Sequence, residues 1–191
     1  NVQGRSLKMF EEREIGIGPK KGKKFKVNCS TSYLAIIEFE NNSMIQLTLS
    51  FDVAAHQMNH IEVYGTKGSA IVPDPNMFGG SCHIFTSSSG KWNEYKTDEM
   101  HLGKINITSQ SSRANESASN ANYRGVGLSE MAYSIEQNEA HRCSGELSLH
   151  VLDIILSTMK ACTTSSSQEI KTSCNKPNYF SNDDVRKLLI V

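Results

Sequence analysis

The sequence predicts an α+β fold, in which an open and mostly antiparallel sheet carries helices on one face. Two observations predict it. The first half of the 191-residue chain alternates apolar and polar residues between short turns, as strands do. The second half spaces its apolar residues as on the faces of helices. Because strands followed by helices are typical of α+β domains, we expect one domain over residues 1–191.

The clearest strand is predicted over residues 45–53, where every second residue is apolar and the residues between them are polar. Its antiparallel partner is expected at residues 33–39, because Glu40-Asn41-Asn42-Ser43 between them has the composition of a turn. Upstream, residues 1–24 lack a strong periodic pattern. We therefore predict an irregular segment there.

Two further strand pairs are expected to complete a meander. Residues 61–64 and 69–72 flank Gly65-Thr66-Lys67-Gly68, whose glycines are expected to take backbone angles closed to other residues. Residues 82–85 and 92–95 form the next pair. A polar loop is predicted over residues 96–122, and its length is typical of loops that have a function or lack order.

Two helices are predicted in the second half. The first has apolar residues from Leu128 to Ile135 on one face and ends before Asn138. The second is expected to be capped by Ser144, with Glu146 in its first turn and Lys160 in its last. Its apolar surface is broad, so we expect it to be covered on more than one side. That surface comprises Leu147, Leu149, Val151, Leu152, Ile154, Ile155 and Leu156.

Weaker patterns predict a short strand over residues 169–172 and a helical turn over residues 183–189. Both segments lie after the second helix.

Composition excludes several classes of partner. The 20 basic and 20 acidic residues cancel, so neither nucleic acid nor a membrane surface is predicted to bind. The lysines of residues 20–26 lie among glycines and are expected to be a solvated segment. Five separated cysteines without a Cys-x-x-Cys pair favour reduced thiols and a cytoplasmic protein. No three His, Asp, Glu or Cys residues have the spacing of metal ligands, so no metal site is predicted.

Three blocks resemble the C-terminal domain of the Gfo/Idh/MocA family of sugar-type oxidoreductases. They are NHIEVYGTKGSAIVPDP at residues 59–75, RGVGLSEMAY at residues 124–133 and HRCSGELSLHVLD at residues 141–153. The resemblance implies a sheet that forms one wall of a substrate cleft facing an N-terminal Rossmann domain absent from this chain. It also implies homo-oligomer contacts through the free sheet face. The strand at residues 33–39 is apolar on both faces, which independently favours a covered second face.

The resemblance implies NAD or NADP as the cofactor of the parent enzyme, with a catalytic Lys in a Glu-Lys-Pro motif that this sequence lacks. Asp52 and His56 have the family's D-x-x-x-H spacing but follow a strand, so we interpret the spacing as coincidence. The glycines of residues 16–22 and 125–130 do not fit the dinucleotide-binding pattern. We therefore expect a fragment that is inactive alone, with no catalytic and no cofactor-binding residues.

Three residues are candidates to bind a small polyhydroxylated substrate: His56, Tyr123 and Arg124. His56 follows the long strand, where it would line the cleft and hydrogen-bond a sugar hydroxyl; the alternative is an ordinary loop histidine. Tyr123 and Arg124 lie where the polar loop meets the first helix. Arg124 would bind an anionic or polyol group with its planar fork of donors, or else form a structural salt bridge.

The predicted function is therefore that of a substrate-binding and oligomerising domain of an NAD(P)-dependent oxidoreductase acting on a sugar, inositol or related polyol. The alternative is a non-catalytic ligand-sensing or scaffold protein with the same fold. A carbohydrate-binding module is disfavoured, because the single Trp and thirteen other aromatic residues do not cluster along the sequence.

Overall fold

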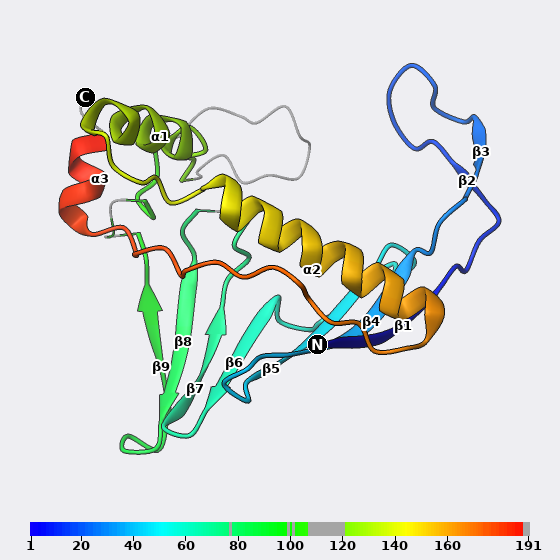
Figure 1. Ribbon diagram of the computed structural model, residues 1–191, viewed down its shortest axis with the longest axis horizontal. Coiled ribbons are helices and arrows are strands. Elements are labelled where there is room, and N and C mark those ends of the chain that lie inside the picture. Colours follow the sequence, from blue (N-terminus) through cyan, green and yellow to red (C-terminus); the bar gives the residue numbers. More distant parts are fainter. Residues whose placement is uncertain (77, 99, 101, 107–120, 189–191) are drawn as a thin grey trace. The chain divides into compact units, whose positions relative to one another are not determined.

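The computed structural model describes residues 1–76, 78–98, 100, 102–106 and 121–188. They form two compact units. The first combines Asn1–His56 with Ser144–Lys176, and the second combines Gln57–Cys143 with Pro177–Val191. The predicted α+β class is confirmed, since the paired strands are antiparallel and helices follow them in the chain (Figure 1). The strands of the described residues fall into sheets of three, two and four strands, not into the single sheet that we expected.

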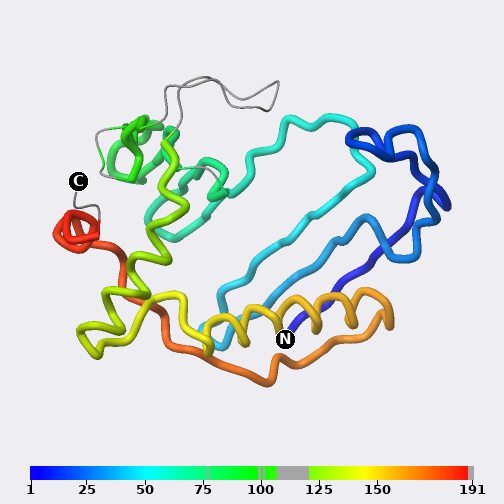
Figure 2. Tube along the Cα trace, turned by 90° about the horizontal axis from the view of Figure 1, so that it is seen from above, coloured from blue at the N-terminus to red at the C-terminus, as the bar shows by residue number. Residues whose placement is uncertain are grey.

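The first unit contains a sheet with strand order β1-β4-β5, formed by Val2–Leu7, Ser32–Glu38 and Met44–Ser50. Helix α2, Gly145–Thr164, runs along β1 and β4 (Figures 1 and 2). The core between them is apolar and comprises Val2, Ala35, Ile37, Ala161 and Cys162. The β4–β5 hairpin was predicted. Strand β1 was not, because its sequence VQGRSL shows no alternation.

A hairpin arm continues the first unit after β1. Strands β2, Glu12–Glu14, and β3, Lys24–Lys26, pair with each other. The lysine cluster is exposed and spans β3 and the connection before it. The prediction of an irregular segment over residues 1–24 is thus wrong. Three-residue strands are too short for a periodic signal to appear in the sequence.

Strand β5 ends at Ser50, three residues before the predicted end at residue 53. Phe51 and Val53 continue the apolar alternation, yet both side chains are exposed. The chain leaves the strand because Asp52 turns inward, where its carboxylate accepts hydrogen bonds from Thr31 and Ser32. A local polar network here overrides the alternation.

The second unit contains a four-stranded meander in the order β6-β7-β8-β9. Its strands are Ile61–Gly65, Gly68–Val72, Ser81–Thr86 and Trp92–Lys96, which agree closely with the predicted segments. Gly65 and Gly68 do not have positive φ, contrary to our expectation. Gly68 is required for another reason: a Cβ atom there would lie 2.1 Å from the carbonyl oxygen of Phe85 on the neighbouring strand.

Helices α1, Val126–Gln137, and α3, Asn182–Leu188, pack against each other in the second unit. Arg142 ties them together: its guanidinium bonds Glu130 of α1 at 3.1 Å and Asp184 of α3 at 3.0 Å. The same side chain donates to the carbonyl of Asn178 and lies 4.2 Å from the ring centre of Phe180. Since Glu130 is buried, an ion pair lies inside this unit.

The helix boundaries were mostly predicted. Helix α1 ends at Asn138, whose φ of 56° is a left-handed C-cap, and Ser144 caps α2 by accepting a hydrogen bond from Leu147 N at 3.2 Å. Helix α2 continues to Thr164, so Lys160 precedes its last turn. The strand predicted over residues 169–172 is absent there. Within residues 168–172, only Gln168 pairs with another strand, through an isolated bridge to Val2.

The outer side of α2 differs from the prediction that its broad apolar surface would be covered. Thr158, Ala161 and Cys162 are buried, whereas six apolar side chains stay exposed. They are Leu149, Val151, Leu152, Ile155, Leu156 and Met159.

Candidate functional site

Three segments meet in the second unit around the ends of the predicted polar loop. They are residues 74–76 and 78–80 after β7, residues 102–106 after β9, and residues 121–124 before α1, and we call them the loop cluster. Phe78 and Ala121 form an isolated antiparallel bridge. Asn106 and Asn122 exchange hydrogen bonds of 2.9 and 2.7 Å. Residues 107–120 of the polar loop lie outside the described residues, so the loop cluster is where its two ends are joined.

Tyr123 and Arg124 belong to this loop cluster. The hydroxyl of Tyr123 donates to the carbonyl of Lys104 at 2.8 Å, and its ring stacks edge-on against Phe78 at 5.8 Å. Arg124 donates to the backbone oxygen of Asn76 at 2.8 Å and to its side-chain oxygen at 3.4 Å. The guanidinium of Arg124 therefore holds the segment after Pro75, and within the described part of the chain it does not form the salt bridge that we had considered.

His60, which was not among the predicted substrate-binding residues, also contacts the loop cluster. Its Nε2 lies 3.9 Å from a carboxylate oxygen of Asp74. In the hairpin register Ile61 pairs with Val72, so His60 and Pro73 are the next residues of the two strands, and Asp74 lies one residue further along. That register was the signal available in the sequence, since a glycine-flanked two-residue turn defines which residues oppose each other.

His56 belongs to the first unit, whereas Tyr123 and Arg124 belong to the second. The histidine is exposed and follows β5 after a short irregular segment. The structure therefore brings together two of the three predicted substrate-binding residues.

Asp52 has a structural environment within the first unit. Its carboxylate is 7% exposed and accepts hydrogen bonds from Thr31 at 2.6 Å, Ser32 at 2.7 Å and Arg13 at 2.6 Å. These donors, with Thr31 first, hold its pKa below the ordinary aspartate value. An ionised carboxylate with three donors is suited to anchoring the β2–β3 arm. This arrangement agrees with interpreting the D-x-x-x-H spacing as coincidence.

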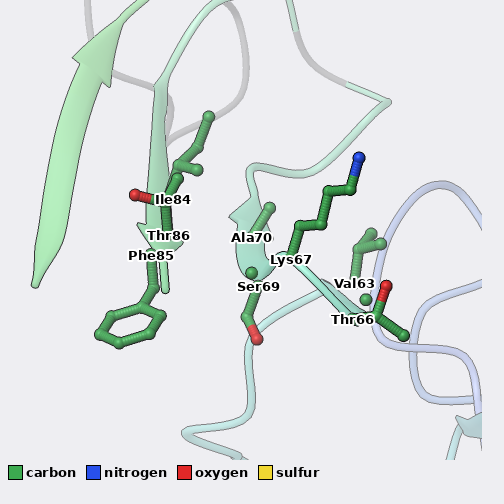
Figure 3. A pocket seen from close by; sticks show the side chains of 10 residues that line it. Val63, Thr66, Lys67, Ser69, Ala70, Ile84, Phe85 and Thr86 are labelled. Carbon is green, nitrogen blue, oxygen red and sulfur yellow. The ribbon is translucent and has the colours of Figure 1, made fainter. Parts of the chain in front are cut away.

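A shallow hollow of about 430 Å³ lies at the β6–β7 turn of the second unit (Figure 3). Small and aliphatic residues line it, together with Thr66 and Lys67 of the turn and Phe85 of β8. The lining includes Val63, Gly65, Gly68, Ala70 and Ile84. Glycines opposite each other at Gly65 and Gly68 leave the space open.

Neither glycine-rich segment both follows a strand and opens a helix, as a dinucleotide-binding turn would. The glycines of residues 16–22 lie in the connection of the β2–β3 arm, and Gly125 and Gly127 open α1 after the loop cluster instead of after a strand. Within the same described ranges, no three His, Cys, Asp or Glu side chains are grouped so as to hold a metal ion. Nor does any helix described here have both the length and the apolar character needed to cross a lipid bilayer.

Comparison with known proteins identifies the fold. Neither a protein-family model nor a curated protein matches the sequence. Among solved structures, 88% of the chain matches an oxidoreductase domain protein from Kribbella flavida, with a TM-score of 0.64 and 15% identity. It also matches, over 88% of its length, an oxidoreductase from Agrobacterium radiobacter in complex with NAD+, L-tartaric acid and magnesium, with a TM-score of 0.58 and 9% identity.

The chain spans 44% and 42% of those two proteins. It therefore shares the fold of somewhat less than half of each oxidoreductase.

Proposed function

We propose that this chain is the substrate-binding and oligomerising domain of an NAD(P)-dependent oxidoreductase that acts on a sugar, inositol or related polyol. The observation that carries the proposal is the fold match, which covers most of this chain and less than half of two oxidoreductases, one of them bound to NAD+. The three blocks that resemble the Gfo/Idh/MocA family support the same assignment.

In this proposal the cofactor belongs to a separate N-terminal Rossmann domain, which supplies hydride transfer. The residues described here do not fit a dinucleotide, so no step of the redox chemistry is assigned to them. Their contribution is to shape the substrate site. Arg124 holds the segment at Asn76 in place, Tyr123 holds the segment at Lys104, and the loop cluster joins the two sides of the polar loop.

Two exposed apolar surfaces support a need for protein partners. On the first sheet, Leu34 and Ile36 point away from the core formed by Ala35 and Ile37, and both are about half exposed. The outer side of α2 is the second surface. We assign the Leu34 and Ile36 face to contacts between copies of the chain, since apolar patches of this kind typically mark interfaces.

Calorimetry on the isolated chain tests the assignment of the cofactor. We expect no binding of NAD+, NADH, NADP+ or NADPH at micromolar concentrations. Micromolar binding of any of the four would contradict the proposal, since this chain would then hold the cofactor itself.

Analytical ultracentrifugation tests the assignment of the oligomer interface. We expect Ile36→Asp to dissociate the oligomer, whereas Ile17→Asp on the exposed hairpin arm leaves it intact. A monomeric unmodified chain, or equal effects of the two variants, would refute the interface.

A non-catalytic sensor or scaffold with the same fold is the alternative function. The coding sequence upstream of Asn1 separates the two. A strand-linked G-x-G-x-x-G together with Glu-Lys-Pro favours the enzyme, and a Rossmann domain without that lysine favours the sensor.

A further inference from the structure

An aromatic row crosses the four-stranded sheet of the second unit. Tyr64 pairs with Ser69, Ser69 with Phe85, and Phe85 with Trp92. Since directly paired residues point to the same side of a sheet, these four side chains lie in one line across β6, β7, β8 and β9. The three rings are scattered along the sequence, and only the strand register aligns them. The lack of clustering along the sequence therefore does not exclude a row of rings in the folded chain.

Two rings of the row are exposed and that of Phe85 is half-buried. Tyr64 is 75% exposed and Trp92 is 50% exposed. Phe85 and Trp92 lie with ring centres 5.8 Å apart at an angle of 55°. Three strand spacings of roughly 4.8 Å separate Tyr64 from Trp92, which gives a row about 14 Å long. Ser69 leaves a gap between the ring of Tyr64 and the other two rings.

Hydrogen-bonding groups lie beside the rings. The next row on the same face comprises Glu62, Ile71, His83 and Glu94. Glu62 accepts hydrogen bonds from Tyr64 and Asn59, and Glu94 accepts one from Ser81 at 2.7 Å. These bonds lower the pKa of each carboxyl group, so both act as acceptors at neutral pH.

The opposite face of this sheet has a different character. It carries Ile61, Val63, Ala70, Val72 and Ile84, and it includes the hollow at the β6–β7 turn. Figure 3 shows Ala70 and Ile84 pointing to one side of the sheet and Ser69 and Phe85 to the other. The aromatic and polar residues are thus separated from the aliphatic ones by the alternation of the strands.

The chemistry of the aromatic face favours one class of ligand. Two carboxylates disfavour anions and nucleic acid. Rings aligned on a flat sheet do not surround a cation as an aromatic cage does, and Lys96 on the same face repels cations. Ionised groups among the rings also differ from the charge-depleted core of a typical protein interface. A sugar fits best, because its C–H faces pack on aromatic rings while its hydroxyl groups donate to carboxylates.

We propose that the face formed by Tyr64, Phe85 and Trp92, flanked by Glu62 and Glu94, is a binding platform for an oligosaccharide. The length of the row suits a short chain of sugar units, because a single sugar ring cannot reach both Tyr64 and Trp92. This site is distinct from the loop cluster, and it does not depend on the proposed redox function.

Trp92 is the only tryptophan, so intrinsic fluorescence reports directly on this site. We would titrate the full chain with maltotriose, cellotriose, xylotriose and chitotriose, following Trp92 emission and heat release. At least one trisaccharide is expected to bind saturably and shift the emission. Removing one stacking ring by Trp92→Ala or Tyr64→Ala is expected to weaken binding roughly tenfold or more, as measured by calorimetry.

Tyr95→Ala is the matched control, because Tyr95 is 53% exposed on the same strand as Trp92 but faces the opposite side. It is expected to bind like the unmodified chain. Circular dichroism and melting temperature verify that each variant folds. The proposal is overturned if no trisaccharide binds at millimolar concentration, if Tyr95→Ala weakens binding equally, or if Trp92 emission responds only to protein concentration through self-association.

Discussion

The two units of this chain are stabilised in different ways. In the first unit, helix α2 closes an apolar core over β1 and β4, with Val2 and Ala161 fully buried. In the second unit, the buried residues include Glu130 and Ser134, and Arg142 joins two helices through ion pairs and carbonyl contacts. The difference teaches that one short chain can combine a unit stabilised by an apolar core with a unit whose interior depends on satisfying a buried charge.

The largest effect is expected from a charge in the apolar core. The side chain of Val2 has no exposed surface, so Val2→Asp buries a carboxylate in the core. This substitution should lower the unfolding free energy by roughly 4 kcal/mol or more. Urea denaturation followed by circular dichroism measures it. Gln3→Asp on the exposed face of the same strand is the control and should change stability little. Equal midpoints for the two variants would show that the first unit does not depend on this core.

Removing the arginine of the second unit should have the next largest effect. Arg142→Met removes the guanidinium that pairs with buried Glu130 and leaves it only the backbone N–H of residue 142, which we expect to cost about 3 kcal/mol in urea denaturation. Arg186→Met serves as the control, because its pair with Asp183 is exposed and should contribute about 0.5 kcal/mol or less.

A double variant sharpens this test. Replacing Glu130 together with Arg142 by Met should recover part of the loss, because no buried charge then remains. If the double variant is less stable than Arg142→Met alone, the unit is held by packing around these side chains and not by the ion pair.

A smaller effect is expected at the β6–β7 turn. Gly68→Ala forces a Cβ atom against the carbonyl oxygen of Phe85, and we expect a loss of about 1–3 kcal/mol. Gly65→Ala meets its nearest atom at 3.6 Å and should change stability by about 0.5 kcal/mol or less. Thermal unfolding of the two variants gives the comparison. Similar melting temperatures of the two variants would mean that β8 does not approach Gly68 of β7 closely enough to exclude a Cβ atom.

The smallest effect is expected in the acid range. Asp153 of α2 accepts hydrogen bonds from Thr172 and from the backbone of Lys171, all at 2.9 Å. These bonds, with the Thr172 hydroxyl first, lower the pKa of Asp153 in the folded state. Its stabilisation is therefore complete above the unfolded-state pKa and is lost as the pH falls through the folded-state pKa.

Asp153→Asn should therefore be less stable at pH 7 and should lose less stability on acidification. Urea denaturation at several pH values from 7 down to 3 measures how the unfolding free energy of the variant and of the unmodified chain changes with pH. Glu169→Gln, at an exposed position, is the control. A variant with an unchanged acid slope would exclude Asp153 as the responsible group.

Much of the fold was predictable because it depends on local signals. The alternation of β5, the turn composition at Asn42 and the cap at Ser144 each act within a few residues. Strand β1 was missed since its residues form a strand only through pairing with β4, which is distant in sequence. The end of β5 was missed for a related reason, because Asp52 is drawn to Arg13 and Thr31.

In the candidate sites, too, local features were predictable and contacts between distant residues were not. Tyr123 and Arg124 were identified from their position between a polar loop and a helix, but their partners Lys104 and Asn76 were not predictable. The contact of His60 with Asp74 required the register of the hairpin.

By itself, the sequence determined the α+β class, the meander of β6 to β9, both long helices and the resemblance to an oxidoreductase domain. These depend on periodicity and turn chemistry, which neighbouring residues encode. Only the tertiary structure decided that the strands form separate sheets, that Arg142 joins α1 to α3, and that Tyr64, Phe85 and Trp92 share one row. Contacts between distant residues are selected by packing and strand register, so no single stretch of sequence contains them.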